Sequence, residues 1–175
     1  MRAAKIRVGI VGATVTPGGS GWGANAHVPA LGTLPDFTLK AVCTAHEATA
    51  QASAAAFGAE LAFHDYAAMV AHPDIDLVAV VVRVPGHHQL VTGALEAGKA
   101  VYCEWPLGAK LAEAEEMAQL AAARGVSTAV GLQTRSDPTF MYARALVQQG
   151  YIGEIVSASM SVVGQAITER GNGRI

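Results

Sequence analysis

The feature that most constrains the fold is an alternation of short apolar runs with longer segments of helical periodicity. The first run, Ile6–Val11, is largely apolar, is rich in β-branched residues and ends at Gly12. A strand that is buried on both faces of a parallel sheet has this character. Residues 22–34 then show helical spacing and stop at Pro35. The repeating unit is therefore a strand followed by a helix.

The same unit recurs along the chain. Further strands are expected at 37–43, 61–63, 77–82, 100–103 and 127–132. Further helices are expected at 48–57, 65–71, 87–97 and 111–124. Gly58, Gly98 and Gly125 follow three of these helices, where a left-handed residue commonly ends a helix. Strands that alternate with helices at this spacing imply right-handed crossovers. The predicted fold class is α/β, with a doubly wound parallel sheet of the Rossmann type.

Composition and charge argue against several classes of protein. Of the 175 residues, 51% are hydrophobic and 15% are charged, which supplies ample apolar material for a core. The 12 basic and 14 acidic residues are scattered, so we expect no direct nucleic-acid partner. No apolar run approaches the ~20 residues of a membrane span, and the N-terminus lacks a signal-peptide pattern. We therefore expect a cytoplasmic location and no membrane partner. Cys43 and Cys103 are expected to be reduced core thiols.

A glycine-rich turn after the first strand carries the first functional signal. Such a turn leaves backbone N–H groups exposed at a helix N-terminus, where an anionic pyrophosphate is favoured. Thr14 stands where the second glycine of a regular Gly-x-Gly would be, so the alternative is a flexible loop capped by glycines. Its place in the first βαβ unit favours dinucleotide binding, with NAD or NADP as cofactor. The candidate residues in and after this turn are Gly12, Thr14, Gly18, Gly19, Ser20 and Trp22.

The residues that follow the second strand leave the choice of cofactor open. An acidic side chain at this point commonly binds the ribose of NAD, whereas a nearby arginine accommodates the 2′-phosphate of NADP. The chain has neither, because the sequence here is Cys43-Thr44-Ala45-His46. Thr44 is the candidate for a hydrogen bond to either ribose or phosphate.

Two further loops follow the fourth and fifth predicted strands, at the sheet edge where ligands bind in open α/β folds. Arg83, Pro85 and His87 are predicted to border the ribose, and Glu104, Trp105 and Gln133 to lie near the nicotinamide. Glu104 ends a buried strand, so it either binds a hydroxyl group or pairs with a cation such as Arg83. Trp105 precedes a proline and offers either a cis peptide bond or a stacking surface. The neighbours His87 and His88 have no third ligand nearby, so no metal site is predicted.

The pattern changes after Leu132. The expected elements are a polar loop at 133–138, a helix at 139–149, an alternating strand at 154–163 and a polar tail at 166–175 that is disordered or leans on a neighbour. We predict a dinucleotide-binding domain at 1–132, followed at 133–175 by a connecting helix and the start of a truncated α+β domain. An unpaired strand needs cover. We therefore expect this segment to dock back on the sheet or to form a homo-oligomer.

Several motifs together carry a family resemblance. They are Val8-Gly9-Ile10-Val11-Gly12, His27-Val28-Pro29-Ala30-Leu31, Ala41-Val42-Cys43, Leu95-Glu96-Ala97-Gly98-Lys99, Glu104-x-Pro106-Leu107 and the run from Gly131 to Pro138. Over nearly the whole chain these motifs resemble the N-terminal NAD(P)-binding domain of the Gfo/Idh/MocA oxidoreductase family. The resemblance implies NAD or NADP as cofactor, a sugar or polyol substrate, and a second, mostly antiparallel domain that often oligomerises.

The chain departs from the family pattern at one position that matters for chemistry. The family's Glu-Lys-Pro tripeptide supplies a lysine implicated in catalysis, and here the middle residue is Trp105. The family's other usual catalytic residues, an aspartate and a histidine, would lie beyond Ile175, so no catalytic residue is assigned. The loop at 21–27, the segment at 83–87 and Glu104-Trp105 resemble the branch that contains the galactose-regulon co-repressor.

Three hypotheses follow from the match and its departures. The first is an NAD(P)-binding domain of an oxidoreductase that acts on a sugar or polyol, with an incomplete catalytic site. The second is a catalytically silent dinucleotide sensor that regulates a partner protein. The third is a structural remnant that binds nothing.

Overall fold

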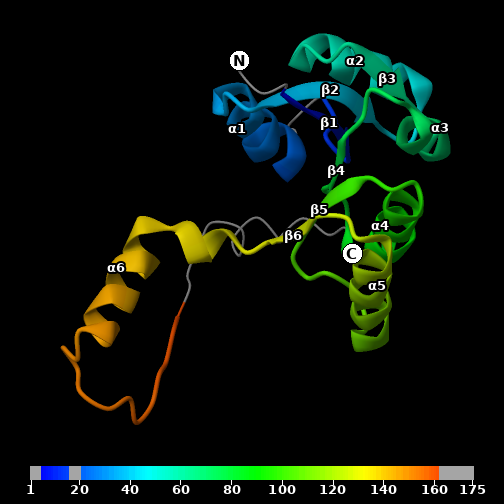
Figure 1. Ribbon diagram of the computed structural model, residues 1–175. Helices are drawn as coiled ribbons and strands as arrows, with labels where there is room; N and C mark the ends of the chain where they lie inside the picture. The colour runs from blue at the N-terminus through cyan, green and yellow to red at the C-terminus, as the bar shows by residue number, and fades with distance from the viewer. Residues whose placement is uncertain (1–4, 16–20, 162–175) are drawn as a thin grey trace, which may run out of the picture. The chain divides into compact units, whose positions relative to one another are not determined.

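A computed structural model describes residues 5–15 and 21–161, and its strands form one parallel sheet (Figure 1). The strands are β1 (Ile6–Val11), β2 (Phe37–Cys43), β3 (Leu61–Phe63), β4 (Leu77–Val80), β5 (Ala100–Glu104) and β6 (Thr128–Gly131). Their order across the sheet is β3-β2-β1-β4-β5-β6. The chain builds outward from β1 to β3 and then returns to add β4 on the other side of β1. The α/β prediction is confirmed, and the switch point lies between β1 and β4, where such sheets bind ligands.

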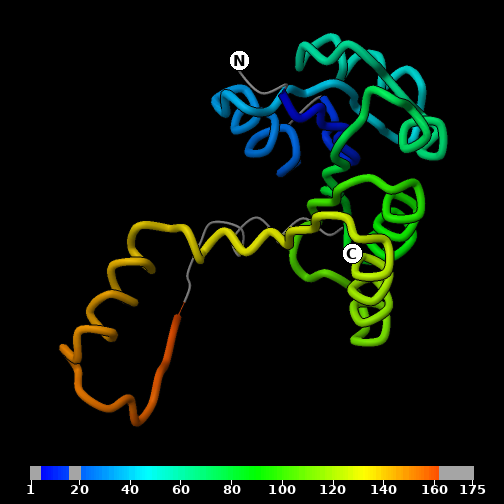
Figure 2. Tube along the Cα trace, in the orientation of Figure 1, coloured from blue at the N-terminus to red at the C-terminus, as the bar shows by residue number. Residues whose placement is uncertain are grey.

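The helices connect the strands in the predicted places (Figure 2). Those of the sheet are α1 (Val28–Thr33), α2 (Glu47–Phe57), α3 (Tyr66–Ala71), α4 (His87–Glu96) and α5 (Leu111–Arg124). Gly58 and Gly125 follow α2 and α5 with φ of 72° and 64°, because the left-handed conformation that ends these helices suits glycine. The helix predicted at 22–34 begins instead as a π-helical segment, η1 (Gly23–His27), before α1. A 3₁₀ turn, η2 (Val84–Gly86), precedes α4.

Each face of the sheet is buried under its own set of helices. Val8, Ile10 and Val42 belong to one apolar cluster, which also receives Val28 of α1 and Phe57 of α2. The other cluster contains alternate strand residues with side chains of α3, α4 and α5, among them Met69, Val91, Leu95 and Met117. Successive strand residues point to opposite faces, so β1 and β4 contribute to both clusters. The central strands are therefore fixed in position from both sides.

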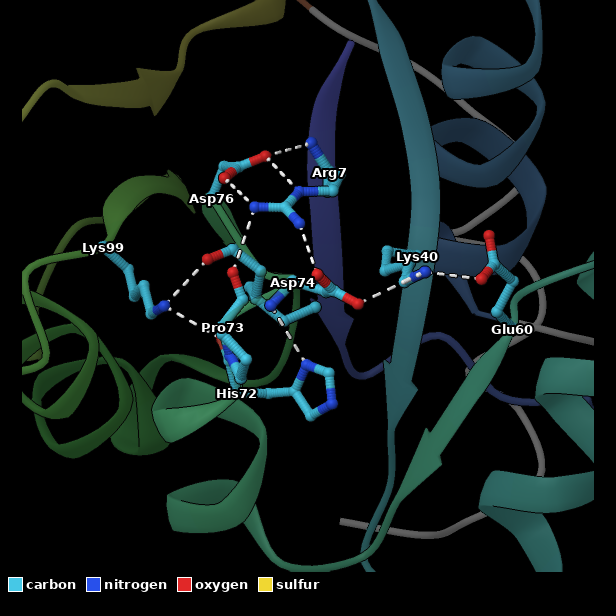
Figure 3. A network of polar contacts seen from close by, with 9 residues as sticks. Arg7, Lys40, Glu60, His72, Pro73, Asp74, Asp76 and Lys99 are labelled. Atoms are coloured by element: carbon cyan, nitrogen blue, oxygen red, sulfur yellow. Dashed lines mark hydrogen bonds and ion pairs between the residues drawn. The ribbon is translucent and has the colours of Figure 1, made fainter. Parts of the chain in front are cut away.

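An ionic network joins the start of β1 to the segment before β4 (Figure 3). The Arg7 guanidinium donates to both carboxylate oxygens of Asp76 at 2.8 and 2.9 Å, to Asp74 and to the carbonyl of Pro73. The hydrogen bonds from Arg7 lower the pKa of Asp76 to about 2. Lys99, which lies just before β5, donates to the carbonyl oxygen of Ile75 in the segment before β4 at 2.8 Å. This network lies at the amino-terminal edge of the sheet, away from the ligand-binding edge.

The chain divides into two compact units, residues 1–132 and 133–175. The second contains a 3₁₀ turn, η3 (Gln133–Ser136), and α6 (Pro138–Gln148), whose first turn is capped by the Asp137 carboxylate. In α6 the structure buries no residue, and apolar side chains such as Val156, which is 95% exposed, follow it.

The strand expected at 154–163 is wrong over the described residues 154–161. Residues 155–161 have no regular secondary structure, and 162 and 163 lie outside the described residues. The alternating pattern of apolar residues is present, but a strand also needs a hydrogen-bonded neighbour. In the part of the chain that the structure describes, no strand pairs with this segment. The tail expected at 166–175 also lies outside the described residues.

Candidate functional site

The turn after β1 brings the backbone of this strand very close to the end of β4. Gly12 has a φ of +97°, and a Cβ there would overlap the carbonyl group of Val81, whose carbon would be only 2.8 Å away. The Gly12 N–H lies 3.3 Å from the carbonyl oxygen of Cys43, at the end of β2. Glycine is therefore required here both by its conformation and by the space around it.

The chain that follows Gly12 packs tightly against η1. Ala13 is fully buried, and a Cβ on Gly23 would lie 3.1 Å from its Cα. The backbone N–H of Val15 donates to the Ser53 hydroxyl of α2 at 3.0 Å. Gly23 thus allows a close helix–strand approach, a role that the sequence prediction missed. The available signal was a glycine within an otherwise helical pattern.

The other residues predicted in this turn are placed less closely. Thr14 is half-buried beside Ala13, and Trp22 is 56% exposed immediately before η1. Gly18, Gly19 and Ser20 lie outside the described residues. The structure therefore places the beginning and the end of the predicted phosphate-binding turn at the carboxyl end of β1.

Thr44, the candidate for ribose or phosphate, is buried in the turn between β2 and α2. Its hydroxyl lies 3.0 Å from the carbonyl oxygen of His46 and 2.7 Å from the hydroxyl of Thr49. These contacts give Thr44 a structural role at the start of α2. Ala45 and His46 are exposed beside it, so they present the surface at this end of β2.

The loop after β4 contains two exposed residues and one buried histidine. Arg83 and Pro85 are exposed, as a role beside a ligand requires. The side chain of His87 is instead only 1% exposed. Its Nδ1 lies 2.9 Å from the carbonyl oxygen of Pro106, and its Nε2 lies 3.0 Å from that of Val82. The ring expected at the ribose edge therefore bridges two backbone segments of the protein itself.

Glu104, at the end of β5, belongs to a cluster of polar and aromatic side chains. Its Oε1 lies 2.8 Å from Nε2 of His27 and accepts a hydrogen bond of 3.0 Å from the Tyr102 hydroxyl. The His27 ring meets that of Tyr102 edge-on with centroids 5.3 Å apart, and that of Trp22 at 6.3 Å. Burial, and then the contact with Glu104, raise the pKa of the Tyr102 hydroxyl.

The sequence prediction did not assign site roles to His27 or Tyr102. Tyr102 could have been found because it lies two residues before Glu104 on the same face of a strand. The side chains of Tyr102 and Glu104 lie over Gly131 of β6, where a Cβ would be 2.8 Å from Oε1 of Glu104. His27 stands in a quoted family motif, but only the fold brings it to the end of β5.

The turn after β5 exposes the residue that replaces the family's lysine. The Trp105 side chain is 63% exposed, and its peptide bond to Pro106 is cis. Gln133, which was predicted to lie near the nicotinamide, begins η3 of the second unit. The first unit thus brings together the ends of β1, β4 and β5, together with η1.

The thiol groups of the two cysteines lie in the core beneath this edge. Cys43 and Cys103 are buried and unpaired by disulfide, as predicted. Burial raises the pKa of the Cys43 thiol to about 11 and that of Cys103 to about 12. Burial therefore disfavours the thiolate form, which is the nucleophilic form, for both side chains.

The fold and the geometry of this edge define the class, which is a dinucleotide-binding α/β domain of the Rossmann type. Residues 6–132 match the protein family described as "Oxidoreductase family, NAD-binding Rossmann fold". The chain belongs to this family, as its resemblance to Gfo/Idh/MocA proteins predicted. Within the described residues, no helix is both long and apolar enough to cross a membrane.

Its relatives include both a dehydrogenase and a regulatory protein. The chain is 37% identical over 163 residues to the dehydrogenase aclE of Aspergillus oryzae, covering 90% of this chain and 44% of the relative. It is 32% identical over 168 residues to the galactose/lactose metabolism regulatory protein GAL80 of Saccharomyces cerevisiae, covering 91% of this chain and 38% of the relative.

A solved structure with bound cofactor has the same fold. The scyllo-inositol dehydrogenase of Lactobacillus casei with NAD(H) and scyllo-inositol superposes with a TM-score of 0.75 at 32% identity, covering 86% of this chain and 43% of that chain. The chain thus spans about two fifths of the length of the relatives it matches.

Proposed function

We propose that this chain binds NAD or NADP across the carboxyl ends of β1 and β4. The observation that carries the proposal is the geometry of Gly12, which has a φ of +97° and no room for a Cβ. A side chain at this point would hold the ends of β1 and β4 apart and would keep a pyrophosphate away from the backbone N–H groups. This geometry fits the family's cofactor.

The other predicted residues would surround the cofactor along this edge. Gly12, Thr14, Gly18, Gly19, Ser20 and Trp22 would border the pyrophosphate. Arg83 and Pro85 would lie beside the ribose, and Glu104 and Trp105 would lie near the nicotinamide. Thr44 and His87 would support the loops around the cofactor without contacting it, because both are buried and their polar atoms contact backbone carbonyl groups. When bound, the cofactor supplies hydride chemistry.

For the whole protein, we propose an oxidoreductase that acts on a sugar or polyol. The similarity to dehydrogenases supports this proposal. We further propose that residues 133–175 begin a second domain that completes the catalytic site. The predicted homo-oligomer and cytoplasmic location remain predictions.

A regulatory function is the second candidate, and one residue favours it. Trp105 stands where the family has a lysine, and an indole can donate a hydrogen bond but cannot accept a proton from an alcohol. The similarity to a regulatory protein points in the same direction. In this alternative, the bound dinucleotide controls contact with a partner protein.

Cofactor titration tests the binding proposal. NAD, NADH, NADP and NADPH are titrated separately into the chain while tryptophan fluorescence is followed. We expect saturable binding of at least one cofactor, and its loss in Gly12→Ala. Gly32→Ala is the matched control, because no heavy atom lies within 4 Å of a Cβ built there. Circular dichroism verifies that each variant is folded.

Two results would count against the proposal. One is a folded parent chain that binds none of the four cofactors. The other is a folded Gly12→Ala variant with the affinity of the parent. Enzyme and regulator are then separated with the natural protein, by following NAD(P)H absorbance with added polyols. Turnover by the natural protein excludes the silent sensor, whereas turnover that appears only in Trp105→Lys supports it.

A further inference from the structure

The two residues that flank Trp105 are each held by a histidine from a different helix. On the amino-terminal side, the Glu104 carboxylate contacts Nε2 of His27 at 2.8 Å. On the carboxyl-terminal side, the Pro106 carbonyl contacts Nδ1 of His87 at 2.9 Å. His27 ends η1 and His87 begins α4. Trp105 itself remains 63% exposed between these two attachments.

The two histidines approach from opposite faces of the sheet. η1 leads directly into α1, whose Val28 and Leu31 pack against one apolar cluster. His87 opens α4, whose Val91 and Leu95 belong to the other cluster. α4 is held by buried side chains, whereas η1 buries Gly23 and Ala24 and α1 contacts its cluster through half-buried side chains, so a shift of either attachment disturbs packed residues. The turn is therefore fixed from two independent directions.

The surroundings of both rings support a positioning role. The His27 ring is packed edge-on between Trp22 and Tyr102, and Tyr102 donates to the same oxygen of Glu104. The second nitrogen of His87 lies 3.0 Å from the Val82 carbonyl, at the end of β4. The His87 ring thus lies between the loop after β4 and the turn after β5.

We propose that His27 and His87 are positioning residues that clamp the turn at residues 104–106, so that Trp105 presents a fixed aromatic surface at the carboxyl edge of β5. Because the indole cannot take over the proton chemistry of a lysine, its use is to stack. This inference rests on the proposed cofactor binding, and the ligand of the Trp105 surface is then the nicotinamide ring. Aromatic contacts depend on ring geometry, so a loose turn would weaken them.

Two amide substitutions at each histidine separate the clamp from a general loss of packing. The side-chain nitrogen of asparagine stands near the position of Nδ1 in histidine, and that of glutamine stands near Nε2. His27→Gln therefore keeps the donor toward Glu104, and His27→Asn removes it. His87→Asn keeps the donor toward Pro106, and His87→Gln removes it. A simple effect of side-chain size would rank asparagine and glutamine alike at both positions.

The readout is the motion of Trp105 in the chain without ligand. Trp22→Phe leaves Trp105 as the single tryptophan, because the chain contains 2. Time-resolved fluorescence anisotropy then reports local motion of this indole on the nanosecond scale. We expect the parent, His27→Gln and His87→Asn to share slow decay, and His27→Asn and His87→Gln to gain a fast component. The proposal is overturned if folded variants lack this crossed pattern.

A measurement on the parent background covers the case in which the variants do not fold. Long-range ¹H–¹⁵N correlation of the histidine rings shows which nitrogens carry protons. The clamp requires a proton on Nδ1 of His87, because a carbonyl oxygen only accepts hydrogen bonds. An unprotonated Nδ1 overturns the attachment to Pro106 without any substitution.

Cofactor titration of the same histidine variants with Trp22 retained keeps the two proposals distinguishable. We expect His27→Asn and His87→Gln to bind the cofactor about two- to tenfold more weakly than their amide counterparts, the range that aromatic geometry contributes. If no variant binds cofactor but the crossed anisotropy pattern is present, the proposed function fails and the clamp stands. If all variants bind equally, the clamp has no role in cofactor binding.

Discussion

The ionic network at the start of β1 leads to a prediction about acid stability (Figure 3). Contact with Arg7 lowers the pKa of Asp76 from its ordinary value of 3.8 to about 2. The free-energy equivalent of this change is roughly 2.5 kcal/mol for a fully shielded group. The Asp76 side chain is 40% exposed, so solvent screening reduces its contribution to about 1 kcal/mol. We expect Asp76→Asn to lower the free energy of unfolding by this amount at pH 7.

The pH dependence of this difference has a definite sign. The pKa of Asp76 is lower in the folded chain than in the unfolded chain, so its charge stabilises the fold fully above pH 4. The stabilisation is lost as the pH falls through the folded pKa of about 2. The gap between the parent and Asp76→Asn should therefore shrink to about half near pH 3.

Urea unfolding followed by circular dichroism at several pH values measures the gap. Asp36→Asn is the control, since the exposed Asp36 carboxylate takes no part in the contacts of Arg7. We expect the control to show no comparable change between pH 7 and pH 3. A gap for Asp76→Asn that is equally large at both pH values would refute the reasoning, because the effect would then not come from the charge of Asp76.

Three further substitutions or treatments test the packing beneath the site. Met69→Ala should lower the free energy of unfolding by about 2–5 kcal/mol, since Met69 is fully buried, and urea unfolding checks this. Ser53→Ala should cost about 1–2 kcal/mol in the same assay, because the Val15 N–H loses its acceptor. Cys43 and Cys103 should resist a thiol reagent at pH 8 until the chain is unfolded, because burial raises their pKa to about 11 and about 12; rapid labelling of the native chain would contradict this.

Most of the fold could be predicted because each strand and helix carries its own local signal. The bounds of β1, β2, β3 and α5 agree with the predicted ones, since apolar runs and terminal glycines mark them directly. The π-helical start at Gly23 was not predicted, because an apolar spacing over 22–34 does not distinguish a π-helical turn from an α-helical one. The strand expected at 154–163 failed for another reason: its pairing partner is not a property of the segment itself.

The candidate site was predictable to the level of loops but not to that of side chains. Sequence order and the α/β pattern identified the turns that hold Gly12, Arg83 and Glu104, because parallel strands end at one edge. They could not reveal that His87 turns inward to two carbonyl groups, or that His27 reaches Glu104 across 77 positions of sequence. Such contacts depend on how the helices pack beside the strand ends and loops, which no local pattern encodes.

The substitution of lysine by Trp105 bears on catalysis more than on cofactor binding. Oxidation of an alcohol needs a group that takes up the hydroxyl proton, whereas binding of the dinucleotide needs only the glycine turn and its surroundings. The Glu104 carboxylate is already in contact with His27 and Tyr102, which suits a structural anchor of the turn. The first unit can therefore serve an enzyme or a regulator equally well. An enzyme must also supply a proton acceptor, which we propose comes from the second domain, whereas a regulator needs none, so turnover of a polyol by the natural protein separates the two.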